Sequence, residues 1–135
     1  LSRIKKGGHP EWLEGNLLSI AGDGCVEFFD VDTKLVKGTI GDTGTFPNPG
    51  GDKAYSPDGK WYVGGQLETP NTRAYTFYRM GDGANFVSPG IPTKADGGVT
   101  RIDGAPRWNR ASDAILVPGL ADDGSRQLFI IRMNV

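Results

Sequence analysis

Four residues that can bind ligands stand near the start of three similar segments of this 135-residue chain. They are His9, Glu11, Asp52 and Arg107. His9 is the only histidine, and it can ligate a metal ion or act as a base because imidazole titrates close to neutral pH. Carboxylates together with a guanidinium can bind a polar ligand. We therefore predict a ligand-binding site formed by these four side chains, and we assign no catalytic residue.

Structural roles compete with this hypothesis at each position. His9 could cap a turn beside Pro10, and the charged side chains could be solvated or paired with one another. The acidic residues beside glycine at 22–24 and 122–124 lack the additional oxygen ligands that a calcium loop needs at fixed spacing. Cys25 is the only cysteine, so it cannot form a disulfide within the chain.

Composition and motifs exclude several classes of function. The 15 basic residues are balanced by 16 acidic ones, which is not the charge pattern of a nucleic-acid-binding protein. No apolar run approaches the roughly 18 residues of a membrane span. The sequence also lacks a Gly-x-Ser-x-Gly elbow, and no Lys-Ser or Lys-Thr follows its paired glycines as in a phosphate loop. We expect no signal peptide at the start of the chain, and the sequence predicts no compartment.

Three segments of the sequence repeat one pattern of a short strand, a polar turn and a second strand. The segments are residues 8–20, 51–63 and 104–117. The first strand of each ends in an aromatic residue, Trp12, Tyr55 or Trp108, and these stand 43 and 53 residues apart. Those spacings bracket the period of roughly 40–50 residues for a four-stranded propeller blade. The recurrence predicts that the three aromatic side chains lie in the core between blades.

Further strands are predicted after each pair. Runs rich in aromatic and β-branched residues indicate third strands at 25–31, 73–79 and 126–132. Fourth strands are expected at 35–40 and roughly 84–88, whereas the third unit ends at Val135 without one. The N-terminal residues 1–6 alternate apolar and basic side chains as 35–38 do, and they could supply the missing strand. The glycine- and proline-rich segment 88–103 is predicted to be a long connection.

These elements predict an all-β fold of about three four-stranded antiparallel propeller blades, half of a six-bladed β-propeller. We predict one domain over 1–135, with blades at approximately 8–45, 46–100 and 101–135 and the N-terminal strand at 1–6. Three blades do not close a ring, and open sheet edges invite pairing. The hypothesis is a homodimer in which each N-terminal strand completes the partner's third blade. A fragment of a longer chain and a self-completed monomer are the alternatives.

One of the repeated segments carries a family resemblance. Residues 55–61, YSPDGKW, resemble the W/F-S-P-D-G-K repeat of TolB-like six-bladed propellers. GHPEW at 8–12 and APRW at 105–108 fit the same frame, and they are also similar to repeats of oligogalacturonate lyases. The resemblance covers nearly the whole chain, through a repeat that many functions share. It implies a propeller fold.

The resemblance to oligogalacturonate lyases also implies a chemistry. In that family several histidines and a glutamine hold a divalent metal, which neutralises the uronate carboxylate with basic residues while a base removes the adjacent proton. Here His9 matches the motif and Gln66 is a possible oxygen ligand, whereas Asp52 and Ala105 stand at the aligned positions of the other repeats. A ring of two chains would bring two copies of His9 into one channel.

The function we predict is a non-catalytic binding or scaffold module of the TolB-like type, with a saccharide or peptide ligand and no cofactor. One alternative is a metal-dependent lyase that acts on acidic saccharides only as an assembled ring, with the metal held by His9 and Gln66. The other is a fragment of a longer propeller protein without independent function. No nucleic-acid partner and no membrane insertion are expected.

Overall fold

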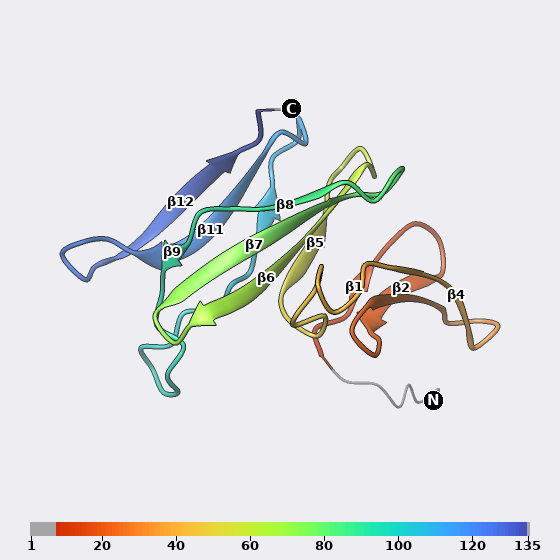
Figure 1. Cartoon of the computed structure of the whole chain (residues 1–135), viewed down its shortest axis with the longest axis horizontal. Coiled ribbons are helices and arrows are strands. Elements are labelled where there is room, and N and C mark those ends of the chain that lie inside the picture. The colour runs from red at the N-terminus through yellow and green to blue at the C-terminus, as the bar shows by residue number, and fades with distance from the viewer. Residues whose placement is uncertain (1–7, 135) are drawn as a thin grey trace. The chain divides into compact units, whose positions relative to one another are not determined.

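The computed structural model describes residues 8–134, and over this range the chain is all-β (Figure 1). It divides into two compact units, the first ending at Gly51 and the second beginning at Asp52. Unit 1 holds a four-stranded antiparallel sheet, sheet A, and unit 2 holds a five-stranded sheet B and a three-stranded sheet C. No helix in the described range could cross a membrane. The all-β prediction is confirmed, while the predicted strand at 1–6 lies outside the described residues.

Sheet A is a meander in which each strand pairs with the next one along the chain. Its strands are β1 (Glu11–Trp12), β2 (Leu17–Ala21), β3 (Val26–Asp30) and β4 (Leu35–Ile40). The Asp30 carboxylate closes the β3–β4 turn by accepting hydrogen bonds from the backbone N–H groups of Thr33 and Asp32, at 3.0 and 2.9 Å. These bonds, that from Thr33 above all, hold the pKa of Asp30 below its ordinary value. The bounds of β4 are those predicted for the fourth strand.

Sheet B has the same meander with one addition. Its strands are β5 (Lys53–Tyr55), β6 (Trp61–Thr69), β7 (Thr72–Arg79), β8 (Asn85–Val87) and β9 (Ile91–Pro92). The β5–β6 turn is held by the Ser56 hydroxyl, which accepts from the Trp61 N–H at 2.9 Å and donates to the Asp58 carboxylate at 2.6 Å. Gly59 supplies the positive φ of 70° that the SPDG sequence predicted. β9 pairs with β7, so the predicted connection at 88–103 contains a short strand.

Sheet C contains three strands. They are β10 (Arg107–Trp108), β11 (Ala114–Leu120) and β12 (Arg126–Arg132). The bounds of β12 match the predicted third strand, and β12 is the outermost strand of its sheet. Within the described residues no further strand follows it.

The sequence repeat is also a repeat of backbone hydrogen bonds. In every sheet the residue after the third strand donates its N–H to the carbonyl of the residue just before the second strand. The three pairs are Val31 with Asn16 at 3.1 Å, Met80 with Lys60 at 2.8 Å, and Met133 with Asp113 at 2.8 Å. The first strands end at Trp12, Tyr55 and Trp108. In all three of these features, adding 53 to a residue number in sheet B gives the equivalent residue in sheet C.

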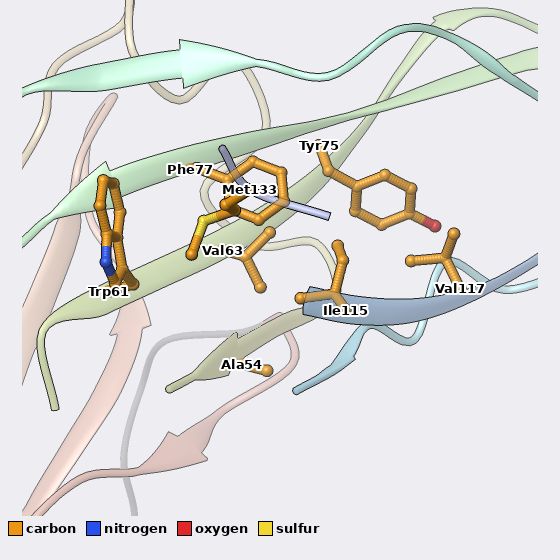
Figure 2. Close-up of a cluster of buried hydrophobic side chains, with 8 residues drawn as sticks. All are labelled: Ala54, Trp61, Val63, Tyr75, Phe77, Ile115, Val117 and Met133. Carbon is orange, nitrogen blue, oxygen red and sulfur yellow. The ribbon is translucent and has the colours of Figure 1, made fainter. Parts of the chain in front are cut away.

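The core of unit 2 lies between sheets B and C (Figure 2). Its buried members are Ala54, Trp61, Val63, Tyr75, Phe77, Ile115, Val117 and Met133. Trp108 packs against this cluster, with its ring 5.8 Å from that of Phe77 in an edge-to-face arrangement. Its indole N–H donates to the Ala54 carbonyl at 3.3 Å. Burying each large apolar side chain contributes roughly 1.5–3 kcal/mol, so this cluster holds the two sheets together.

The three repeated aromatic residues do not share one environment. Trp108 packs on the core as predicted, and the half-buried Tyr55 meets the Tyr62 ring edge-on at 5.2 Å. Trp12, by contrast, is 59% exposed, so it does not lie in a core within unit 1. The reason is that Trp108 has sheet B to pack on, whereas sheet A is the only sheet among the described residues of unit 1.

Candidate functional site

His9 and Glu11 stand at the start of sheet A. His9 is exposed, and its backbone N–H donates to the Gly50 carbonyl at 3.0 Å. Gly8 has a φ of 97°, and a Cβ on it would come within 2.9 Å of the Gly50 backbone, so this close approach requires glycine. The half-buried Glu11 accepts a hydrogen bond from the Ser19 hydroxyl on its carbonyl oxygen, at 3.0 Å. The backbone of this segment is therefore well held in unit 1, and the imidazole lies at the surface.

Asp52 lies in unit 2, just before β5, and its carboxylate is engaged inside that unit. Oδ2 accepts a hydrogen bond from the Gly104 N–H at 2.9 Å and lies 3.5 Å from Nη1 of Arg73. Both side chains are mostly buried, with 19% of Asp52 and 12% of Arg73 exposed. Nη2 of Arg73 makes a long 3.5 Å bond to the Ile102 carbonyl, and its buried Nε makes no hydrogen bond. Asp52 is therefore the main compensation for a buried cation.

Gly104 is held on both of its backbone groups. Its N–H donates to Asp52, and its carbonyl accepts from the Tyr75 hydroxyl at 2.8 Å. A Cβ at this position would lie 1.9 Å from Nη1 of Arg73, so the ion pair and the chain can approach only because residue 104 is glycine. Burial raises the pKa of Tyr75 to about 12, an effect that the Arg73 charge reduces and the Asp52 charge increases. Asp52 thus positions the segment that leads into sheet C.

Arg107 and Gln66 lie at other places in unit 2. Arg107 is the exposed first residue of β10, where its guanidinium donates to the Pro106 carbonyl at 3.1 Å. Gln66 is half-buried in β6, and its amide oxygen accepts from the Thr76 hydroxyl at 3.3 Å. The cation that pairs with the Asp52 carboxylate is Arg73, a residue that the sequence did not single out.

The two residues predicted to hold a divalent metal, His9 and Gln66, belong to different units. One offers an exposed imidazole, and the other an amide oxygen that already accepts a hydrogen bond. Over residues 8–134 no three or more His, Cys, Asp or Glu side chains gather in a way that could hold a metal ion. The described residues therefore add no cluster of these ligand types to the predicted pair.

The most distinctive surface of unit 2 is one face of sheet C, which we call the open face. Cross-strand partners project from the same side of a sheet, and the pairings place Arg107, Leu116 and Ile130 in one row across it. The neighbouring rows add Ala114, Leu128 and Arg132. Leu116, Leu128 and Ile130 are 38%, 67% and 60% exposed.

A hollow of about 350 Å³ lies on this part of sheet C. It is lined by Arg107, Trp108, Asn109, Ala114, Ile115, Leu116, Ile130 and Arg132. Its floor on the open face is aliphatic, and Arg107 and Arg132 are the charged side chains among its lining residues. The surface can therefore bury apolar groups of a partner, with cationic groups beside them.

The sequence of β12 carries a signal for this surface. In β12 the residues of both faces are apolar, since Leu128 and Ile130 alternate with Phe129 and Ile131. Strands that are apolar on both sides are typical of sheets that are covered on both faces. Sheet B covers the face with Phe129 and Ile131, and within the described residues of unit 2 no sheet covers the other.

A second hollow, of about 430 Å³, lies at the β6–β7 hairpin. It is lined by Leu67, Glu68, Thr69, Pro70, Ala95 and Asp96. Two backbone bonds join the hairpin to the 88–103 segment, from Thr93 to Asn71 at 2.9 Å and from Ala95 to Pro70 at 3.2 Å. The carboxylates of Glu68 and Asp96 make this hollow acidic, but it lacks the extended apolar surface of the open face.

Comparisons with known proteins add little to this geometry. No family model and no curated protein matches the chain. Among solved structures, it is similar to a crystal structure from Bacteroides fragilis NCTC 9343 that is named, provisionally, a 6-phosphogluconolactonase, with 14% identity and a TM-score of 0.41. The alignment covers 98% of this chain and 41% of that protein, so the chain spans about two fifths of its length.

Proposed function

We propose that this chain is a non-catalytic binding and assembly module built from propeller-type blades, similar in its repeat to TolB-like proteins. The observation that carries the proposal is the open face of sheet C, where Leu116, Leu128 and Ile130 lie exposed side by side. Contiguous exposed apolar surface marks an interaction site in proteins that otherwise bury such side chains. The binding surface is therefore this sheet face.

The chemistry of the open face favours a protein partner over a saccharide. The floor of its hollow is formed by Ala114, Leu116 and Ile130, which offer no side-chain hydrogen-bond groups. A saccharide placed on this floor would lose hydration of its hydroxyl groups, and only the polar side chains at the rim, Arg107, Asn109 and Arg132, could replace part of it. An apolar protein surface would lose nothing comparable, because covering aliphatic side chains is favourable by about 25 cal/mol per Å².

The four-residue ligand site remains a separate prediction. Of its members, Arg107 lies in a row of the open face, and Asp52 stabilises the segment before β10. His9 and Glu11 lie in unit 1.

An apolar fluorescent dye, anilinonaphthalene sulfonate, tests whether the open face binds in solution. We expect dilute protein to raise the emission of the dye, and Ile130→Asp to remove most of that increase, because a carboxylate in the row repels the apolar and anionic dye. Leu35→Asp is the matched control, since Leu35 is 59% exposed and belongs to β4 of sheet A, not to sheet C. Emission that stays at the buffer level, or that Ile130→Asp leaves unchanged, would contradict the proposal.

A further inference from the structure

The packing of sheet B on sheet C defines how two consecutive sheets of this repeat meet. Sheet B contributes the cross-strand row Ala54, Val63 and Phe77, and Phe86 of β8 continues it. Sheet C contributes the row Trp108, Ile115 and Ile131. The Trp108 indole belongs to this interface, with its N–H on the Ala54 carbonyl and its ring against Phe77.

The open face of sheet C repeats the face that sheet B uses in this interface. The shift of 53 residues takes the row Ala54, Val63 and Phe77 to the row Arg107, Leu116 and Ile130. In sheet B this row is covered by sheet C, and Val63 and Phe77 are fully buried. The equivalent row in sheet C has exposed side chains. By analogy, the surface that covers it should resemble the face of sheet C that packs on sheet B, which carries Trp108, Ile115 and Ile131.

Sheet A carries a face of that kind. The residues equivalent to Trp108, Ile115 and Ile131 are Trp12, Leu18 and Phe29, which the register places in one row across β1, β2 and β3. Val36 of β4 extends the row. We call this row of four residues the Trp12 face. Leu18 is buried, whereas Trp12 and Val36, at the two ends, are 59% and 47% exposed.

We infer that the open face of sheet C binds the Trp12 face of a second copy of this chain. This inference rests on the proposed function and names its partner. The contact continues the interface already formed between sheets B and C, with each residue replaced by its repeat equivalent. It needs no particular arrangement of the two units within one copy, because the two faces come from different molecules.

The inferred contact assigns specific roles to its residues. Trp12 takes the place of Trp108, so its indole N–H donates to the carbonyl of Arg107, the residue equivalent to Ala54. Its ring lies against Ile130, the residue equivalent to Phe77. The aliphatic part of the Arg107 side chain covers the indole, and its guanidinium stays at the rim. Tryptophan in a desolvated position is a common centre of binding energy.

The contact is heterologous, because one copy contributes sheet C and the other contributes sheet A. Such contacts either close into a ring or continue as a filament, depending on the rotation between copies. Two copies that make both contacts with each other form a closed pair, which is the homodimer predicted from the repeat count. Here the pairing is specified through sheet faces rather than through exchange of the N-terminal strand.

Sedimentation velocity of the full chain, over a series from micromolar to submillimolar concentration, tests the inference. We expect the wild-type protein to associate as its concentration rises. Ile130→Asp damages only the open face and Trp12→Ala only the Trp12 face, so each variant alone is expected to weaken association by at least about tenfold. Leu35→Asp is the matched control, because Leu35 is exposed on the opposite face of sheet A, next to Val36.

Mixing the two variants gives the decisive readout. The intact open face of Trp12→Ala meets the intact Trp12 face of Ile130→Asp, so an equimolar mixture regains association that neither variant shows alone. A contact between two open faces predicts the opposite, since Trp12→Ala would then associate like the wild type. Circular dichroism confirms that both variants keep the native fold, as expected for substitutions at exposed positions.

Three outcomes overturn the inference: a wild-type mass of one chain throughout, wild-type association by Trp12→Ala, or no rescue in the mixture. The dye experiment separates this failure from that of the proposed function. If the dye binds the open face of a protein that stays monomeric, the binding surface stands and the second copy is the wrong partner. If the dye does not bind and the chain does not associate, both proposals fail.

Discussion

At the scale of single residues, unit 2 depends on an ion pair that joins two distant parts of its sequence. Asp52 accepts the Gly104 N–H and lies beside Arg73, whose guanidinium is mostly buried. Removing one partner of such a pair leaves the other charge without compensation, and this usually costs more than the pair itself contributes. Asp52 was predicted as a ligand-binding residue, and the geometry gives it a positioning role.

Asp52→Asn tests this role. The amide can still accept the Gly104 hydrogen bond, but it no longer compensates the Arg73 charge, so we expect a loss of about 1–3 kcal/mol in the free energy of unfolding, since the pair is partly exposed. Urea denaturation measures the loss. Asp82→Asn is the control, because Asp82 pairs with Arg79 at the surface and its loss should change stability little. If Asp52→Asn is as stable as the control variant, Asp52 does not position the segment at Gly104.

At the scale of elements, equivalent positions of the repeat acquire different roles from their neighbours. Trp12 and Trp108 both end the first strand of a sheet, but only Trp108 meets another sheet within its own unit. Its hydrogen bond to Ala54 and its ring contact with Phe77 fix how sheet C lies on sheet B. The stacking of these two sheets therefore depends on this side chain.

Phenylalanine at each of the two tryptophan positions gives a matched comparison. Trp108→Phe removes the bond to the Ala54 carbonyl and part of the ring, and we expect it to lower the free energy of unfolding by about 1–2 kcal/mol. Trp12→Phe in dilute protein should change it by less than about 0.5 kcal/mol, because the side chain is exposed. Denaturation curves at low protein concentration compare them. Equal losses for the two variants would show that Trp108 has no special place in the interface.

At the scale of the whole molecule, the three sheets differ in how fully they are covered. Sheet B is buried on both faces, with Tyr62, Ala74 and Thr76 on one side and Val63 and Phe77 on the other. Sheet C is covered on one face only. If a second copy covers its open face, the stability of the molecule depends on its own concentration, because binding to the native state stabilises it.

Thermal unfolding checks this dependence. We expect the midpoint of wild-type unfolding to rise by several degrees between dilute and concentrated samples, since a hundredfold excess over Kd adds about 2.7 kcal/mol. The midpoint of Ile130→Asp should stay constant over the same range, because its open face no longer binds. If the wild-type midpoint does not change with protein concentration, no second copy binds the open face.

Local sequence patterns predicted most of the strands correctly, because strand formation and turn geometry depend on residues close in the chain. The bounds of β4 and β12 and the Ser56 turn follow from alternation, β-branched content and the SPDG motif. The short strand β9 was missed, because two residues give no periodic signal and form a strand only by pairing with β7.

Local patterns in the sequence predict the all-β architecture and the repeated pair of strands. Which polar groups meet and which apolar faces stay open depends on how distant segments pack. Asp52 and Gly104 are 52 residues apart, and no local pattern encodes their hydrogen bond. Trp12 and Trp108 occupy the same repeat position, yet one is exposed and the other packs on a core. The physical reason is that burial depends on what a neighbouring sheet covers, and that is settled when distant segments pack.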